Sequence, residues 1–360
     1  MTNPVASLPY ATADLPGVGG VLRQTDDDFR VDERLPYAPV GSGDHVYVRI
    51  EKRGLSTPRA AELIARALGV NPRDVGWAGM KDRHAVTRQT LSLPPPCTPE
   101  AACALQVPGI SVLEAVRHRH KLRTGHVASN HFTLRICAID GDETVAVARA
   151  QDILDALARA PGCPNYFGAQ RFGKDGDNAD IGRALVTGAP LPGGMRKPRG
   201  RKLRLFVSAL QSRLFNEYLA GRMRDGQFRQ VLAGDILQKR ISGGSFACEE
   251  PAREQARVEA GELVPTGPMF GHKVMRAPEG TAARAREDAL LLAHGLTLEA
   301  FASVGKLGVG TRRPLAVALS EPSVKTSGVG AIELCFGLPA GAYATAVVRE
   351  VVKGSDPFPG

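Results

Sequence analysis

The sequence has little of what indicates a secreted, membrane-bound or cysteine-rich protein. Its six cysteines lie far apart and include no C-x-x-C pair, which disfavours disulfides and a cysteine metal site and favours reduced thiols. No apolar run approaches the roughly 18 residues of a membrane span, and the N-terminal residues lack a signal-peptide pattern. We therefore expect a cytoplasmic protein that does not enter a membrane.

Motifs for several kinds of enzyme are also missing. The glycine-rich stretches at residues 17–20 and 305–310 do not follow a strand with G-x-G-x-x-G spacing, and no G-x-x-x-x-G-K-[ST] loop occurs. The eight histidines include no H-E-x-x-H or H-x-E pattern, and no G-x-S-x-G elbow is present. The sequence thus predicts neither a nucleotide cofactor nor a metal.

What the sequence does have is an excess of positive charge. Lys and Arg number 46 against 37 Asp and Glu, which gives a net charge of +9 and favours a polyanionic partner. Two segments concentrate these cations, and each on its own could be a solvated face; together they indicate a nucleic acid. The first segment has Arg196, Lys197, Arg199, Arg201, Lys202 and Arg204, and the second has Arg117, Arg119, Lys121 and Arg123 alternating with His118, His120 and Leu122.

Hydrophobic periodicity predicts a mixed α/β fold. Period-two alternation favours strands near residues 46–51, 88–93, 111–117, 131–138, 315–319 and 331–336. Helical spacing favours helices near residues 57–68, 143–159, 210–223, 282–292 and 347–352. Residues 161–201 are rich in Gly, Pro and Arg, which predicts a domain boundary there. Because strands return at the end, we expect both terminal parts to build one sheet around an inserted middle.

Asp82 is the residue best placed for chemistry. It follows a glycine-rich segment that cannot continue a helix or strand, and it precedes a predicted strand. Lys81 and Arg83 flank it, and positive neighbours favour the ionised carboxylate that a nucleophile or base requires. On residue type alone, a loop aspartate is more often a cap or turn residue.

Three sequence segments together resemble the tRNA pseudouridine synthase D family. The most specific is the run at residues 76–89, Gly-Trp-Ala-Gly-Met-Lys-Asp-Arg-His-Ala-Val-Thr-Arg-Gln. Pro-Asn-Tyr-Phe-Gly-Ala-Gln-Arg-Phe-Gly at residues 164–173 and Ser-Ala-Leu-Gln-Ser-Arg-Leu-Phe-Asn at residues 208–216 follow in the family's order. Weaker segments at residues 28–33, 130–134 and 338–345 extend the likeness from about Arg23 to Lys353.

The resemblance implies a fold of two parts. Residues 1–161 and 318–360 would form a discontinuous pseudouridine synthase core with a mixed α/β sheet. Residues 162–317 would form the family-specific inserted α/β domain, with the active-site cleft between the two. It also implies a stand-alone enzyme that uses no cofactor, no metal and no obligate protein partner.

The resemblance also implies the reaction and its residues. A uridine of tRNA, usually position 13 of the D-arm, would be isomerised to pseudouridine with Asp82 as nucleophile, by attack on the base or by assisted elimination at the sugar. Phe29, Asn130 and Tyr343 would contact the uracil, and Arg23 would pair with the nucleophile. Position 343 is Tyr where Phe is the family habit, which keeps the aromatic face. The basic run Arg196, Lys197, Arg199, Arg201 and Lys202 would hold the RNA backbone.

Two other functions remain open on sequence grounds. A non-catalytic tRNA-binding module or RNA chaperone would keep the basic clusters without turnover, although the presence of Asp82, Asn130, Phe29 and an aromatic residue at position 343 disfavours it. A tRNA methyltransferase would need a nucleotide-type cofactor loop, which the sequence lacks.

Overall fold

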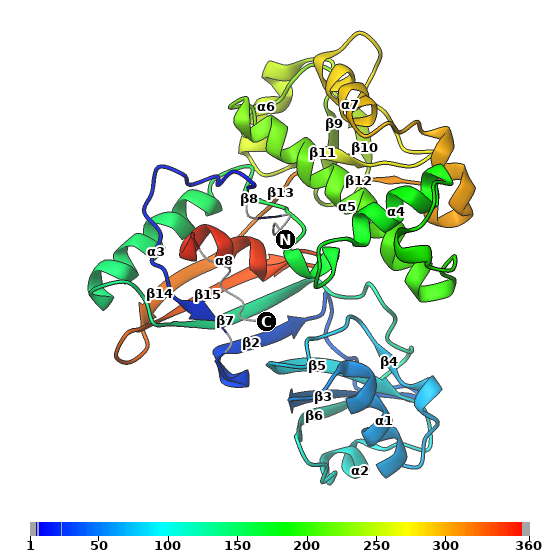
Figure 1. Cartoon of the computed structure of the whole chain (residues 1–360). Helices are drawn as coiled ribbons and strands as arrows, with labels where there is room; N and C mark the ends of the chain where they lie inside the picture. The colour runs from blue at the N-terminus through cyan, green and yellow to red at the C-terminus, as the bar shows by residue number, and fades with distance from the viewer. Residues whose placement is uncertain (1–4, 6, 23, 355–360) are drawn as a thin grey trace. The chain divides into compact units, whose positions relative to one another are not determined.

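The computed structural model describes residues 5, 7–22 and 24–354, drawn in Figure 1. The predicted site residue Arg23 lies outside the described residues. The chain divides into two compact units. We call Leu15–Asp155, Leu319–Ala344 and Val351–Gly360 the nine-stranded unit, and Met1–Asp14, Ala156–Ala318 and Thr345–Glu350 the four-stranded unit.

The nine-stranded unit is built on one mixed sheet of order β14-β15-β7-β2-β5-β3-β6, with β1 added on β7 and β4 on β5. Strands β2 and β5 are parallel, and the other pairs are antiparallel. The strands are β1 (Val21–Leu22), β2 (Phe29–Arg34), β3 (His45–Arg53), β4 (Gly76–Trp77), β5 (Val86–Leu93), β6 (Ile110–His118), β7 (Ser129–Cys137), β14 (Ser320–Thr326) and β15 (Ala331–Pro339). The sheet therefore joins strands from both ends of the chain, as the sequence predicted.

Helices close one face of this sheet over β3 and β5. Helix α1 (Thr57–Ala67) begins with Pro58 in its first turn, where the missing N–H costs no hydrogen bond. Its small apolar face, with Ala61 and Ile64, packs on Val48 and Ile50 of β3, and all four are at most 2% exposed. The remaining helical segments of the unit are η1 (Asp26–Asp28), η2 (Pro72–Asp74), α2 (Pro99–Cys103) and most of α3 (Glu143–Ala158).

The four-stranded unit has a sheet of order β10-β9-β11-β12 and a two-stranded pair of β8 with β13. Its strands are β8 (Cys163–Pro164), β9 (Ile236–Lys239), β10 (Ser245–Ala247), β11 (Leu263–Met269), β12 (Thr311–Pro314) and β13 (Ala316–Val317). Its helical segments are η3 (Ala169–Phe172), α4 (Asn178–Thr187), η4 (Pro192–Gly194), α5 (Gly200–Arg224), α6 (Pro251–Glu259), α7 (Ala282–Ala293), η5 (Glu299–Gly308) and most of α8 (Ala344–Val352).

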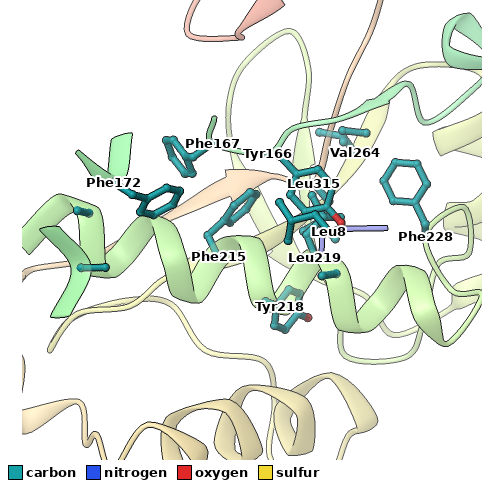
Figure 2. Packing of buried hydrophobic residues seen from close by; sticks show 14 residues of the cluster. Leu8, Tyr166, Phe167, Phe172, Phe215, Tyr218, Leu219, Phe228, Val264 and Leu315 are labelled. Carbon is teal, nitrogen blue, oxygen red and sulfur yellow. The ribbon is translucent and has the colours of Figure 1, made fainter. Parts of the chain in front are cut away.

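Helix α5 is the centre of the four-stranded unit. Phe215, Tyr218 and Leu219 of this helix belong to one cluster of aromatic and aliphatic side chains (Figure 2), and each is at most 2% exposed. The helix packs on β11 at Gly267, where a Cβ would lie 3.1 Å from the rings of both Phe215 and Tyr218. A side chain at position 267 would therefore push the strand away from the helix.

Among the helices formed by residues 5, 7–22 and 24–354, none has the length and apolar character needed to cross a lipid bilayer.

Candidate active site

The loop that carries Asp82 is anchored at both ends and open in the middle. Ala78 is 2% exposed and Ala85 is fully buried, whereas Asp82 itself is exposed. The loop runs from the end of β4 to the start of β5, so Asp82 precedes a strand as the sequence predicted, whereas Gly76–Trp77 forms a strand that was expected to be part of the loop. Asp82 is therefore a solvent-facing carboxylate on a short loop whose ends are fixed in the core.

Lys52 at the end of β3 holds the main chain of this loop from inside the sheet. Its Nζ donates to the carbonyl oxygen of Asp82 at 2.8 Å and to that of Leu55 at 2.5 Å. The side chain is fully buried and, within the part of the chain that the structure describes, it forms no ion pair. Burial lowers the pKa of Lys52 to about 8, opposed by the charge of Asp82, while the nearby Lys81 lowers it further.

A second anchor comes from a chain of hydrogen bonds through Thr57. The Thr57 hydroxyl donates to Gln89 Oε1 at 2.9 Å and accepts the main-chain N–H of Lys81 at 2.9 Å. Thr57 and Gln89 are fully buried, so the side chains that hold the main-chain N–H of Lys81 are themselves fixed in the core. Gln89 therefore supports the loop through Thr57.

Glu33 and Lys81 form a buried ion pair under the loop. Their side chains are 0% and 6% exposed, and Glu33 Oε1 also accepts the N–H of Thr90 at 3.3 Å. A charge in this environment is stable only while its partner is present. The pair therefore ties the loop to strands β2 and β5.

Removing one charge of this pair is expected to destabilise the protein strongly. Glu33→Gln leaves the Lys81 ammonium buried without its carboxylate, which costs about 3–5 kcal/mol for pairs of this kind. We expect a clearly lower Tm in thermal unfolding followed by circular dichroism. The matched control is Glu62→Gln on α1, whose ion pairs with Arg59 and Arg66 are on the surface, and a similar loss of Tm in both variants would contradict the argument.

The register of the sheet places Asn130 beside this polar cluster. Asn130 on β7 is opposite Glu33 of β2 on one side and Leu338 of β15 on the other. Opposed residues share one face of a sheet, and Gln89 lies on the same face one strand further along. The Oδ1 atom of Asn130 is buried and has no hydrogen-bond partner in the described part of the chain. An acceptor without a donor thus lies on the same face as the supports of the Asp82 loop.

An aromatic row on the same face includes Phe29. Phe132 stacks on Phe336 with ring centroids 5.6 Å apart and meets Phe29 edge-on at 6.1 Å. Phe29 is only 3% exposed, so its ring is part of the core in this structure. Tyr343 differs, since it lies in the loop between β15 and α8 and is 42% exposed.

The basic run at residues 196–202 lies in the four-stranded unit, at the start of α5. Arg196, Lys197, Arg199, Arg201 and Lys202 are all exposed, and none forms an ion pair with a described residue. Arg196, Lys197 and Arg199 line a hollow of about 570 Å³. Arg201 and Lys202 fall in the first turn of α5, where the helix dipole is positive and no acidic residue offsets it.

The other two family-like segments meet inside the four-stranded unit. The side-chain amide of Asn216 accepts the N–H of Phe167 and donates to its carbonyl oxygen, both at 2.9 Å. Arg171 Nε donates to Ser212 Oγ at 3.2 Å, and the Arg313 guanidinium lies 4.2 Å from the centre of the Phe167 ring. In this unit the two segments fix each other, so their side chains have a structural role.

Sequence reasoning missed Lys52 and Glu33. Both continue an apolar alternation on their strands, Lys52 after Val48 and Ile50 and Glu33 after Val31. A charged residue at a position where the pattern requires an apolar one was the signal that could have identified them.

Comparisons with known proteins match nearly the full length of the chain. The family model described as tRNA pseudouridine synthase D (TruD) matches residues 6–191 and 196–351. A tRNA pseudouridine synthase D of Anaeromyxobacter dehalogenans (strain 2CP-C) is 50% identical over 356 residues, covering 99% of each chain. One from Geobacter metallireducens is 40% identical over 407 residues and covers 97% of this chain and 98% of its own.

A solved structure shares the fold. A crystal structure from Methanosarcina mazei under the same family name superposes with a TM-score of 0.81 at 23% identity, covering 98% of this chain and 97% of that one. The match to the family model and the 50% identity over nearly the full length both indicate the same family. The chain belongs to the tRNA pseudouridine synthase D family.

Proposed function

We propose that this tRNA pseudouridine synthase acts on uridine 13 of the D-arm and that Asp82 is its nucleophile. The observation that carries the assignment of Asp82 is its exposed carboxylate on a loop fixed from beneath by Lys52 and Thr57. A carboxylate that is accessible to a substrate and held by a rigid support suits nucleophilic catalysis. The choice of position 13 follows the family resemblance.

The reaction needs no external redox partner. The C1′–N1 bond of the uridine breaks, the uracil turns, and a C1′–C5 bond forms. N1, which carries no hydrogen in uridine, gains a proton from solvent, and the proton of C5 leaves to solvent, so atoms and electrons balance. Asp82 would serve as an anion, either by attacking the base or by assisting elimination at the sugar. The charge of Asp82 in turn raises the pKa of Lys52 beneath the loop, against the effect of burial.

The uracil would be recognised by the face that carries Asn130. The free acceptor Oδ1 of Asn130 matches the N3–H donor of uracil, and pairing the two would satisfy both groups. The exposed ring of Tyr343 would stack on a base turned out of the RNA helix. Phe29, which meets Phe132 edge-on, would contact the uracil with its ring. Arg23 would pair with Asp82.

The basic run Arg196, Lys197, Arg199, Arg201 and Lys202 would bind the tRNA backbone. This run belongs to residues 162–317, which we propose as the inserted domain of a core formed by residues 1–161 and 318–360. Unpaired, exposed cations at the positive end of a helix are suited to phosphate. The active-site cleft between the two domains stays a prediction.

The run can be tested by salt dependence. The variant Arg199→Gln/Arg201→Gln/Lys202→Gln is expected to weaken tRNA binding and to reduce the slope of log Kd against log salt by about one for each true phosphate contact. Filter binding at several salt concentrations measures the slope. A slope equal to that of the wild type would mean that the run is only a solvated face.

A further inference from the structure

A second basic segment lies in the nine-stranded unit, at the end of β6 and in the loop that follows it. It contains Arg117, Arg119, Lys121 and Arg123, and none of them is paired with a carboxylate of the described residues. The Arg117 side chain donates to the carbonyl oxygen of Gly43 and the Lys121 side chain to that of Arg73, each at 3.4 Å. We call residues 117–123 the basic strap. No carboxylate of the described residues forms an ion pair with it.

The basic strap is packed against the segment that leads to Asp82. Leu122 of the strap is 1% exposed and shares a core cluster with Ala78. At Gly76 a Cβ would lie 2.3 Å from the Leu122 carbonyl oxygen, so only glycine permits this approach. Gly125, just beyond the strap, donates its N–H to the Ala78 carbonyl oxygen at 2.9 Å. The chain then continues directly into β7, which carries Asn130, so the strap contacts the start of the Asp82 loop and precedes the strand of Asn130 in sequence.

Stacked rings fix the strap in place. Tyr37 stacks on His118 with centroids 5.5 Å apart and planes 10° apart, and its hydroxyl lies 2.8 Å from Nδ1 of His126. Tyr47 also packs on His118, with the two ring centroids 4.2 Å apart. Burial, and then the charges of His120, Arg119 and His45, lower the pKa of His118. These histidines are no metal centre, since no three potential ligand side chains gather in a metal-binding arrangement among the described residues.

We propose that the basic strap binds phosphates of the substrate RNA next to the nucleotide that is modified. The inference rests on the proposed function, because it takes RNA as the ligand. Arg side chains present paired N–H donors to phosphate, and unneutralised cations release counterions from RNA when they bind. The position of the strap beside the Asp82 loop makes its phosphates those nearest the target uridine. It holds the backbone while the base turns toward Asp82.

The test is a double variant, Arg119→Gln/Arg123→Gln, which changes two exposed side chains without touching Tyr37 or the buried Leu122. The control is Arg59→Gln/Arg66→Gln, which removes the same charge from the exposed face of α1. Binding of a tRNA transcript and tritium release from C5 are measured for both, at several salt concentrations. We expect about tenfold weaker binding at low salt, a slope of log Kd against log salt smaller by about 1.5, and a raised KM for tRNA.

The possible results of this experiment distinguish a failure of the strap proposal from a failure of the proposed function. If the control loses as much affinity and slope as the strap variant, the strap has no site of its own and the proposal is wrong. An unchanged KM and slope in the strap variant would also overturn it. If the wild type binds tRNA but releases no tritium, the proposed function fails, and the binding measurements still decide whether the strap contacts phosphate.

Discussion

Replacing Asp82 by asparagine is expected to reduce turnover at least about 10³-fold while tRNA affinity stays within a few fold. The amide is nearly the same size as the carboxylate but is not a nucleophile. The support of the loop is kept, because Lys52 donates to the main-chain oxygen of residue 82 rather than to its side chain. Removal of the carboxylate also removes no contact to phosphate, so binding has no reason to fall.

The measurement is release of tritium from C5 of uridine in a folded tRNA transcript, with no added metal or cofactor. The control is Asp74→Asn, which removes an exposed carboxylate from η2 in the same unit. Full activity of Asp82→Asn would exclude Asp82 as nucleophile. If neither the wild type nor the control releases tritium while both bind tRNA, the chain would instead be a binding module.

Replacing Lys52 by methionine is expected to lower kcat by about 10²-fold with little change in KM. Methionine fills a similar volume, but the carbonyl oxygens of Asp82 and Leu55 lose their shared donor. The Asp82 loop would then lose its fixed position, and a displacement of about 1 Å at a reacting group can cost this much rate. Lys52 acts through the loop, so it is a positioning residue.

The pH dependence distinguishes this role from a general loss of structure. Between pH 8 and the ordinary Lys pKa of 10.5, the folded protein has released the Lys52 proton while the unfolded chain retains it. The contribution of this group to the free energy of unfolding therefore rises with pH through that window. The kcat of the wild type is expected to fall above about pH 8, as the charge beneath Asp82 disappears.

In Lys52→Met both pH effects should be absent. Stability is measured by urea unfolding at pH 7 and 9.5, and kcat over the same range. The control is Lys325→Met on β14, whose exposed ammonium pairs with Glu333 and whose loss should leave both profiles unchanged. A Lys52→Met protein with wild-type kcat and the wild-type alkaline decline would remove Lys52 from the mechanism.

Several elements could be predicted where burial imposes a clear pattern on the sequence. Strand β3 shows its buried face as Val46, Val48 and Ile50, and β15 was found for the same reason. Strand β14 was missed because its residues are mostly exposed and polar, so no alternation exists. Strand β11 was missed because two prolines interrupt it, and its place comes from packing on α5. The predicted strand at residues 315–319 is reduced to Ala316–Val317.

The candidate site was only partly predictable. Asp82 stands out in a glycine-rich loop, and the sequence placed it correctly in a loop before a strand. The contact of Lys52 with its carbonyl oxygen joins residues 30 positions apart, which no local pattern encodes. Phe29 was expected to offer a face to the base, yet β2 directs it into the core. The substrate contacts of Asn130, Tyr343, Phe29 and Arg23 stay predictions.

The position of β15 in the sheet constrains how the protein can be made. Strand β7, which carries Asn130, pairs with β15 along nine residues, and β15 begins only at Ala331. During synthesis on the ribosome, one edge of β7 stays unpaired until about two hundred further residues have been translated. A nascent chain with such an unpaired strand edge is prone to aggregate. A nascent chain therefore cannot complete the sheet around Asn130 before almost all of its residues have been translated. Premature termination would leave a fragment that is prone to aggregate rather than a partly active enzyme.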